Sequence, residues 1–211
     1  MSERVHHPIF ARVYTRVARL SEARGGAAHR SSMLEGCRGR VVEIGAGGGA
    51  NFAHYPSEVT EVLAVEPERH LREQATRAAA SARVKVTVSD GHAGSLPCET
   101  AGFDVGVASL VLCTVPDQEA ALAELFRAIR PGGELRFYEH VRAHDRGEAR
   151  FQDFADATFW PRLAGGCHLG RDTSTAIAAA GFELEALERF PYSFARYVPP
   201  AAHILGVARR P

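Results

Sequence analysis

The sequence predicts a three-layer α/β fold with a doubly wound, mostly parallel sheet. Between residues 40 and 139, short runs rich in β-branched residues alternate with segments of helical length, and such alternation joins parallel strands through right-handed crossovers. The first of these strands ends in a run of glycines, as strands beside a ligand site often do. With 211 residues, of which 45% are hydrophobic and 24% charged, the chain has the size and composition of one globular domain.

The parallel part of the sheet is expected to contain a succession of strands and the helices between them. The helix-forming segments cover residues 68–81 and 117–130, and Pro131-Gly132-Gly133 is expected to separate the second helix from the last strand. The segment after the glycine run is short and is interrupted by Pro56. The strands are expected at residues 40–44, 61–66, 84–88, 103–109 and 134–139.

Both ends of the chain add to this central unit. Residues 8–24 place apolar side chains at helical spacing and stop at Gly25-Gly26, so a helix is expected there. At the other end, residues 182–190 and 202–208 are apolar with little helix between them. We expect these two stretches to form an antiparallel hairpin beside the parallel strands, which completes a seven-stranded sheet.

Composition argues against several function classes. Lys and Arg together number 25, as do Asp and Glu, so the net charge does not indicate nucleic-acid binding. Residues 1–40 carry eight arginines and three glutamates; we interpret them as a solvated helix face, with contact to an anionic ligand or a membrane surface as the alternative. The four cysteines form no C-x-x-C pair, and no signal peptide or apolar run of membrane-spanning length occurs. These features predict a cytoplasmic protein with reduced cysteines.

The segment from Glu43 to Ala50 carries the strongest functional signal. Gly45-x-Gly47-x-x-Ala50 satisfies the dinucleotide pattern G-x-G-x-x-G/A, so the glycines alone leave an NAD(P) site open. Glu43 favours another ligand, because its carboxylate would repel a pyrophosphate and attract a cationic amino or sulfonium group. Glu66, at the end of the second strand, is the acidic residue expected to accept hydrogen bonds from ribose hydroxyls.

Several segments carry a resemblance to a known family. Val41 to Phe52, Phe103-Asp104-Val105, Ser109 to Val115 and Ile129 to Gly133 resemble class I S-adenosylmethionine (SAM)-dependent methyltransferases, whose fold is Rossmann-like. The likeness covers about residues 38–208 and is closer to the thiol S-methyltransferases of animals and their bacterial relatives. The segments of this closer likeness are Gly49-Ala50-Asn51-Phe52 with Tyr55-Pro56, Leu110 to Cys113, Glu139-His140-Val141, and Gly166 to Leu169.

The resemblance implies a SAM site along the strand ends, with S-adenosylhomocysteine (SAH) as its product. Many relatives carry Asp or Glu at position 92, so Asp90 is the alternative to His92 for adenine. The animal proteins also have a hydrophobic N-terminal anchor that is missing here, although the amphipathic segment 8–24 would suit peripheral membrane contact. The residues implied are Glu43, Gly45, Ala46, Gly47 and Asn51 around methionine, Glu66 and Pro67 for ribose and adenine, His92 and Ala93 for adenine, and Ser109 and Leu110 as the floor.

Methyl transfer from a sulfonium is an in-line displacement that depends mainly on alignment of donor and acceptor. A thiol acceptor needs only modest help with deprotonation. His140, at the end of the fifth strand, is the first candidate base, and His168 with Asp172 is the second. No metal is expected, because the i, i+4 spacing of His140 and His144 stands without an H-E-x-x-H or C-x-x-C motif, even with Cys167-His168 nearby.

We therefore expect a single-domain methyltransferase acting on a small acceptor, with a thiol as the leading class. Residues 1–38 would form a helical lid, residues 39–140 the SAM-binding core, and residues 141–211 the acceptor-side helices and last strands. The alternatives are methylation of a lipid amine, a quinone or a natural-product hydroxyl on the same fold. An NAD(P)-dependent oxidoreductase and a SAM-binding protein without catalysis are the remaining hypotheses, and the oligomeric state is left open.

Overall fold

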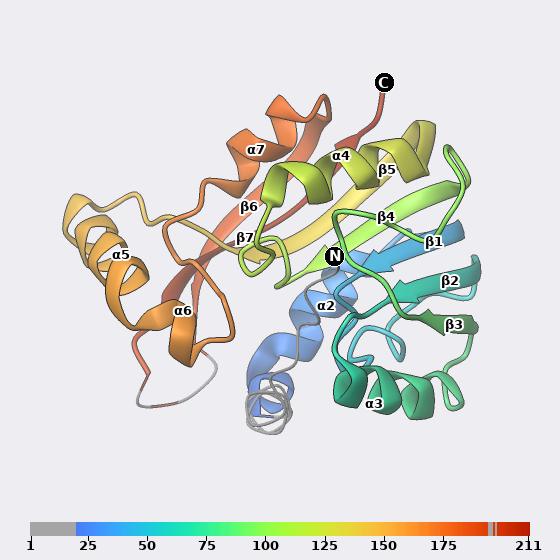
Figure 1. Ribbon diagram of the computed structural model, residues 1–211, viewed down its shortest axis with the longest axis horizontal. Helices are drawn as coiled ribbons and strands as arrows, with labels where there is room; N and C mark the ends of the chain where they lie inside the picture. The colour runs from blue at the N-terminus through green and yellow to red at the C-terminus, as the bar shows by residue number, and fades with distance from the viewer. Residues whose placement is uncertain (1–19, 194–195, 197) are drawn as a thin grey trace.

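The structure is a computed structural model, which describes residues 20–193, 196 and 198–211. A seven-stranded sheet crosses the molecule in the order β3-β2-β1-β4-β5-β7-β6 (Figure 1). Strands β1 to β5 pair in parallel, and β7 pairs antiparallel with β5 and β6. The predicted fold class and the C-terminal hairpin are confirmed. The strands are β1 (Gly39–Ile44), β2 (Val59–Val65), β3 (Lys85–Ser89), β4 (Phe103–Ser109), β5 (Ile129–His140), β6 (Glu183–Tyr192) and β7 (Ala201–Arg209).

Helices cover both faces of the sheet and make the predicted three layers. In Figure 1, α4 and α7 lie on one side of the sheet and α2 and α3 on the other. Within the described part of the chain, no helix is long and apolar enough to cross a membrane. The helical elements are η1 (Glu22–Gly26), α2 (Ala27–Leu34), α3 (Arg69–Ala79), α4 (Gln118–Ala128), α5 (Arg146–Thr158), α6 (Trp160–Leu163) and α7 (Thr173–Ala179).

The alternation of side chains along β1 divides the core between these layers. Val42 and Ile44 belong to a cluster that includes Leu122 and Leu125 of α4. Val41 points the other way, into a cluster that includes Met33 of α2. Successive side chains of a strand face opposite sides of a sheet, and a parallel strand covered on both sides is apolar throughout. This explains why β1 is apolar from Val41 to Ile44 apart from Glu43.

The boundary between α4 and β5 differs from the expected one. The strand begins at Ile129 rather than at residue 134, and the pairing with β4 shifts register between Phe103 and Val105. Gly132 has a φ of 76°, which an L side chain rarely adopts. The helix ends at Ala128, since Ile129 is already extended two residues before Pro131, and the Pro-Gly-Gly segment continues as an irregular part of the strand.

The structure describes only part of the helix expected over residues 8–24. Residues 8–19 of the predicted helix lie outside the described residues. Gly25, with a φ of 117°, marks a kink, and the chain resumes as α2 directly after Gly26. Gly25-Gly26 therefore ends one helical stretch without ending the helical region, and α2 was not predicted. This helix matters because it carries Arg30 to the end of the sheet.

Candidate active site

The candidate site lies at the carboxyl ends of β1, β2, β4 and β5, which point to the same side of the molecule, toward α5 and α6 (Figure 1). The turn after β1 has positive φ at Gly45 (60°), Gly47 (56°) and Gly49 (83°). Glycine adopts this conformation without the steric cost that a side chain brings. The turn therefore places backbone without side chains at the sheet edge, where a ligand can approach it closely.

Glu43 lies beneath this turn as a buried carboxylate with two donors. Asn51 Nδ2 donates to its Oε1 at 2.8 Å, and the Tyr55 hydroxyl donates to its Oε2 at 2.7 Å. Burial raises the pKa of Glu43 to about 7, against the opposing effect of these two hydrogen bonds and of Arg30. A carboxylate so far removed from water is stabilised in its charged form by any cation that binds next to it.

Arg30 connects the N-terminal helical region to the same edge. From α2, its Nη1 donates to Asn51 Oδ1 and to Ser109 Oγ, both at 2.8 Å, and its Nε donates to Glu22 at 2.7 Å. The residue is 5% exposed. Arg30 was not among the predicted site residues, since nothing in the sequence distinguishes it from the other arginines of residues 1–40. It places a buried positive charge beside two residues expected at the cofactor site.

Glu66 follows β2 and holds two backbone groups in place. Its Oε2 accepts from the N–H of Gly47 at 2.8 Å, and its Oε1 accepts from the N–H of Glu68 at 2.9 Å. Burial raises its pKa, and these backbone hydrogen bonds lower it. A carboxylate oxygen has a second lone pair, so each oxygen retains capacity for a further donor such as a hydroxyl. Glu66 thus fixes the glycine turn relative to β2.

The adenine side of the predicted site is formed by the segments after β2 and β3. Arg72 donates to the carbonyl oxygens of Glu66 and Pro67, at 2.8 and 2.9 Å. Asp90, the alternative to His92, pairs with Arg72 at 3.1 Å and is mostly exposed. The backbone of His92 forms an isolated bridge with Ser95, and Ala93 packs against the core. An adenine contact at His92, or at Asp90 in its place, stays a prediction.

Glu139 organises the loop that follows β4. The residue is fully buried, and its carboxylate accepts from the N–H groups of Val111 at 3.0 Å, Leu112 at 2.9 Å and Cys113 at 3.1 Å. Just before this loop, Leu110 has a φ of 55°, an uncommon value for a residue with a side chain. Strained positions of this kind often lie at ligand sites. The sequence indicates Glu139 only as part of the segment Glu139-His140-Val141, and no local signal predicts its role in shaping the expected floor.

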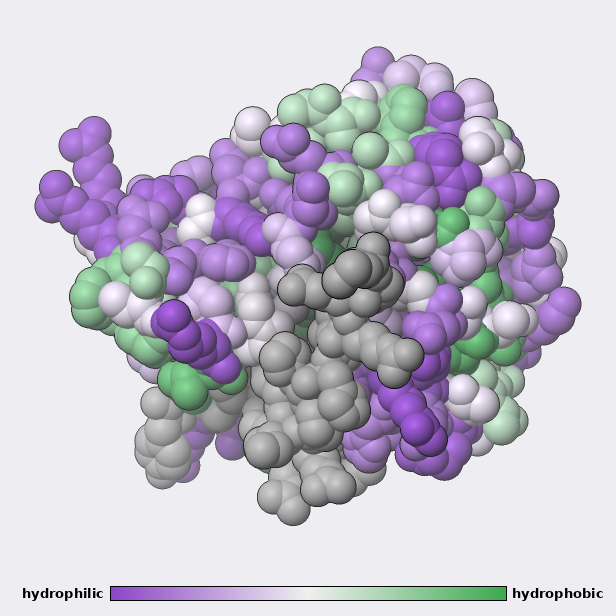
Figure 2. Space-filling view, in the orientation of Figure 1, coloured by the Kyte–Doolittle hydropathy of each residue, from purple (hydrophilic) through white to green (hydrophobic). Residues whose placement is uncertain are grey.

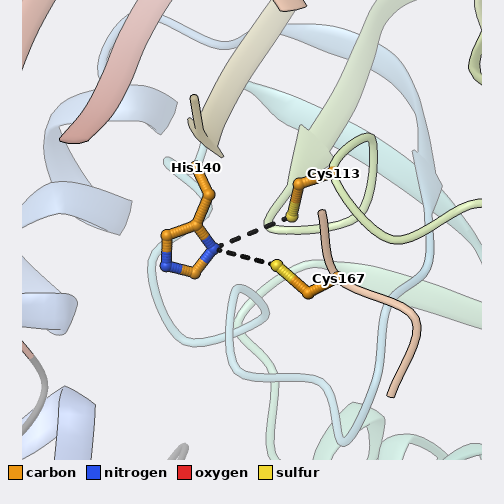
Figure 3. A group of neighbouring side chains, drawn as sticks. All are labelled: Cys113, His140 and Cys167. Atoms are coloured by element: carbon orange, nitrogen blue, oxygen red, sulfur yellow. Dashed lines mark hydrogen bonds between the residues drawn. The ribbon is translucent and has the colours of Figure 1, made fainter. Parts of the chain in front are cut away.

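His140, the first candidate base, lies between two cysteines that the sequence separates widely (Figure 3). Its Nδ1 is 3.8 Å from Cys113 Sγ and 3.6 Å from Cys167 Sγ. The N–H of His168 donates to the carbonyl oxygen of Cys113 at 2.8 Å, which ties the two cysteine-bearing loops together. No sequence signal predicted this cluster, because none of its three spacings matches a known motif.

The cluster shares protons among its members. A hydrogen bond with Cys113 lowers the pKa of Cys167 and raises that of Cys113. Burial opposes protonation of His140, but the hydrogen bond and charge of Cys167 raise the pKa of this histidine. The ring of His203 packs against that of His140, with centroids 4.2 Å apart and the ring planes tilted by 49°, and burial lowers the pKa of His203 to about 3. His203 is therefore a neutral support for the His140 ring.

The side chains of the second candidate pair, His168 and Asp172, have other partners in the structure. Asp172 is the N-cap of α7, where its carboxylate accepts from the N–H and the hydroxyl of Thr175 and from the hydroxyl of Ser174. Its visible role is to cap this helix. The carboxylate near His168 belongs instead to Asp156, at 3.9 Å from His168 Nδ1. A role for His168 or Asp172 in catalysis stays a prediction.

The segment expected to face the acceptor presents apolar side chains. Trp160 and Ala164 pack against the cluster of Cys113, Cys167 and Leu169. Figure 2 shows hydrophobic residues gathered over α5 and α6, at the left of the molecule. The large apolar side chains exposed on this part of the chain are Phe151, Phe154, Phe159 and Leu163.

Comparisons with known proteins agree on one class of enzyme. The model of the methyltransferase domain family matches residues 42–137. The chain is 36% identical over 181 residues to the thiol S-methyltransferase TMT1B of Mus musculus, covering 83% of this chain and 73% of that protein. It is 29% identical over 158 residues to a phosphatidylethanolamine N-methyltransferase of Cereibacter sphaeroides, with 74% of each chain covered.

A solved structure shares the whole fold. It belongs to a SAM-dependent methyltransferase of Thermotoga maritima, described as a possible histamine N-methyltransferase, and superposes with a TM-score of 0.72. The alignment covers 96% of this chain and 97% of that one at 20% identity. At this identity the likeness concerns the Rossmann-like fold and not the acceptor.

Proposed function

The chain belongs to the SAM-dependent methyltransferases, and we propose that it methylates the sulfur of a small, fairly apolar thiol. The observation that carries the proposal is the 36% identity to a thiol S-methyltransferase over 83% of the chain. The geometry fits: His140 lies at the end of β5 and contacts Cys113 and Cys167, which belong to a small apolar cluster with Leu169. The family rules out the NAD(P)-dependent oxidoreductase, because it identifies the chain as an enzyme that uses SAM.

The residues around the glycine turn fit the methionine end of SAM. We propose that the amino group binds near Glu43, whose buried carboxylate lacks a cation in direct contact among its hydrogen-bond partners named above. Arg30 supplies positive charge for the carboxylate of the same ligand, next to Asn51. The backbone of Gly45, Ala46 and Gly47 lines the turn.

The remaining parts of SAM are assigned along the sheet edge. We propose that Glu66 accepts from the ribose hydroxyls through its free lone pairs, since each oxygen has only one backbone donor. Pro67 and Ala93 would border the adenine with His92, and Ser109 and Leu110 would form the floor. SAM supplies a methyl group activated on a sulfonium sulfur.

The chain's own task is to align and deprotonate the acceptor. Glu139 fixes the loop that carries Cys113, and His203 supports the ring of His140. Holding the acceptor sulfur in line with the methyl group can supply about 7–11 kcal/mol of the barrier. The thiol proton is removed at the cluster of Cys113, His140 and Cys167, with His140 as the proposed base.

The N-terminal lid remains part of this proposal. Arg30 reaches Asn51 and Ser109 from α2, and the hydroxyl of Tyr192 donates to the carbonyl oxygen of Ser21 at 2.8 Å. These contacts hold residues 21–30 between the cofactor edge and β6. We propose that residues 20–38 cover the bound cofactor; residues 1–19 of the expected lid lie outside the described part of the chain.

Cofactor affinity is expected to depend on pH through Glu43. Its pKa of about 7 in the free protein means that the carboxyl must lose a proton to pair with the ligand's amino group. SAH affinity should therefore fall as pH drops below about 7, by up to about tenfold per pH unit. Calorimetry between pH 6 and 8 in buffers of different ionisation enthalpy should detect proton release on binding at the lower pH.

The Glu43→Gln variant is the control for this pH dependence. Its amide keeps the size of the side chain but does not titrate, so SAH should bind more weakly with a nearly flat pH profile. An unchanged pH profile in Glu43→Gln would show that another group is responsible. In the unliganded wild type, the raised pKa of Glu43 destabilises the folded protein. This destabilisation is absent below about pH 4.5 and reaches its full size above about pH 7.

The acceptor class is tested with a panel of thiols, amines, catechols and quinols and with methyl-labelled SAM. We expect label on alkyl and aryl thiols. Label on amines alone would overturn the thiol proposal and favour the second candidate, a lipid amine, which the 29% identity to a phosphatidylethanolamine N-methyltransferase supports. Label on oxygen alone would favour a quinol or natural-product hydroxyl.

A further inference from the structure

The cluster of Cys113, His140 and Cys167 has the geometry of a metal site. The ligand atoms of the three residues, two Sγ atoms and one imidazole nitrogen, all lie within 4.8 Å of one another. A tetrahedral zinc ion with Zn–S of about 2.3 Å and Zn–N of about 2.05 Å separates a sulfur ligand from a nitrogen ligand by about 3.6 Å. Here Nδ1 of His140 is 3.6 Å from Cys167 Sγ and 3.8 Å from Cys113 Sγ. Both nitrogen–sulfur distances therefore already match a tetrahedral zinc site, and the three side chains converge on one point (Figure 3).

Neighbouring groups hold the three candidate ligands in place. Cys113 is fixed by the bond from its N–H to Glu139 and by the bond from the N–H of His168 to its carbonyl oxygen. The ring of His140 is supported on one face by His203. Cys113 and Cys167 are buried, at 1% and 5% exposed. A site that is organised before the metal arrives loses little conformational freedom on binding it.

The donor set and its location indicate which metal fits. Two thiolates and an imidazole are soft and borderline ligands, which suit zinc and not magnesium or calcium. Three protein ligands are also one fewer than a structural zinc site uses, and catalytic zinc sites keep the remaining position open. The cluster lies where β4 and β5 end, the same edge of the sheet as Glu43 and Glu66.

We propose that Cys113, His140 and Cys167 bind one Zn²⁺, whose fourth position takes the sulfur of the acceptor thiol. The metal site stands on the geometry alone, whereas the role of the fourth position rests on the proposed function. This inference departs from the expectation of no metal, which was based on spacing in the sequence. It also changes the task of His140, because a nitrogen bound to zinc cannot accept a proton.

Zinc would then perform the deprotonation. A thiol that coordinates zinc is bound as the thiolate, and its proton leaves to water. The sulfur lone pair forms the new S–CH₃ bond, and the electrons of the broken sulfonium–methyl bond stay on the sulfur of SAH. The neutral thioether product is a weaker zinc ligand than a thiolate, so water replaces it and the site is regenerated.

Metal content is the first test. The protein is purified under reducing conditions, supplied with Zn²⁺, freed of loosely bound metal by gel filtration and analysed for zinc. We expect one zinc per chain in the wild type and at least about a tenfold lower content in Cys113→Ser, His140→Ala and Cys167→Ser. Cys98→Ser is the matched control, since Cys98 is a half-buried cysteine outside the cluster and should leave the zinc content unchanged.

Folding of each variant is checked by its SAH affinity, which should stay within about twofold of the wild type. Because a buried cysteine variant can fail to fold, Co²⁺ is also bound to the wild type in place of zinc. We expect the visible absorption of tetrahedral cobalt and the charge-transfer absorption of cobalt–thiolate bonds. Wild-type protein that retains no zinc and gives neither absorption overturns the proposal, as does a disulfide between Cys113 and Cys167 that forms under the same reducing conditions.

The role of the fourth position is tested by adding an acceptor thiol to the Co²⁺ protein. We expect its cobalt spectrum to shift, and the matching alcohol to leave it unchanged. A spectrum that stays constant while the thiol is still methylated overturns this role. If the thiol shifts the spectrum but is never methylated, the metal site stands and the proposed function fails. Methylation by metal-free protein would return the base role to His140 and overturn the zinc mechanism.

Discussion

Replacing Gly45 with alanine should lower the free energy of unfolding by about 2–5 kcal/mol, the sum of the steric cost of positive φ and of overpacking. A Cβ at this position would clash with Cγ2 of Val111 and approach its Cβ to 2.9 Å. The residue also has a φ of 60°. Relief of the clash would move either the glycine turn or the loop held by Glu139, and both belong to the proposed cofactor site. SAH affinity should therefore fall by more than about tenfold.

Thermal unfolding and SAH titration measure this effect, with Gly94→Ala as the control. A Cβ at Gly94 would meet Ala120 at 3.5 Å, an ordinary contact, without positive φ, so its melting temperature and affinity should match the wild type. The double variant Gly45→Ala/Val111→Ala should recover part of the loss in stability, since it removes the Cγ2 clash but leaves the strained φ. A Gly45→Ala protein that melts within about 1 °C of the wild type would contradict the geometry of the turn.

Glu66→Ala should weaken SAM and SAH binding about 10- to 100-fold, which corresponds to the loss of charge-assisted hydrogen bonds to ribose. The variant also removes the acceptor for the N–H of Gly47, so the glycine turn loses a support. Stability should change less than affinity, because removing a buried carboxylate whose pKa is raised recovers part of its desolvation cost.

Calorimetric titration with SAH distinguishes these effects. Glu66→Gln keeps one acceptor oxygen and should lie between the wild type and Glu66→Ala. Glu73→Ala, an exposed residue of α3 paired with Arg69, should bind SAH as the wild type does. An affinity of Glu66→Ala within about twofold of the wild type would remove Glu66 from the cofactor site, whatever happens to stability.

The fold could be predicted because its signals are local. β-branched runs, helix-length segments and the glycine turn each appear within a few residues of sequence, and the strands fell close to their expected positions. The boundary of β5 was wrong since its irregular start at Pro131-Gly132-Gly133 depends on pairing with β4. Local sequence patterns carry no information about the register between two strands that are distant in the sequence.

The site was harder to predict because its polar contacts join distant segments. Glu43 and Glu66 could be named because each lies next to the last residue of a strand. Arg30 could not be named, since its place in the site depends on hydrogen bonds to Asn51 and Ser109, which are distant in the sequence. The approach of Cys113 and Cys167 to His140 likewise depends on loops held by Glu139 and His168, and neither cysteine stands in a spacing that predicts a metal site.

Methyl transfer to a matched thiol and alcohol tests the central claim most directly. The two acceptors share one carbon skeleton and differ only in the sulfur or oxygen atom, and labelled SAM is supplied to wild type, Cys98→Ser and His140→Ala. The proposal predicts label on the thiol and none on the alcohol in the wild type and in Cys98→Ser. His140→Ala should bind SAH normally but lose at least about 100-fold in kcat/KM for the thiol. Equal labelling of the alcohol, or full thiol activity in His140→Ala, would contradict the claim that this protein activates a thiol at the cluster of Cys113, His140 and Cys167.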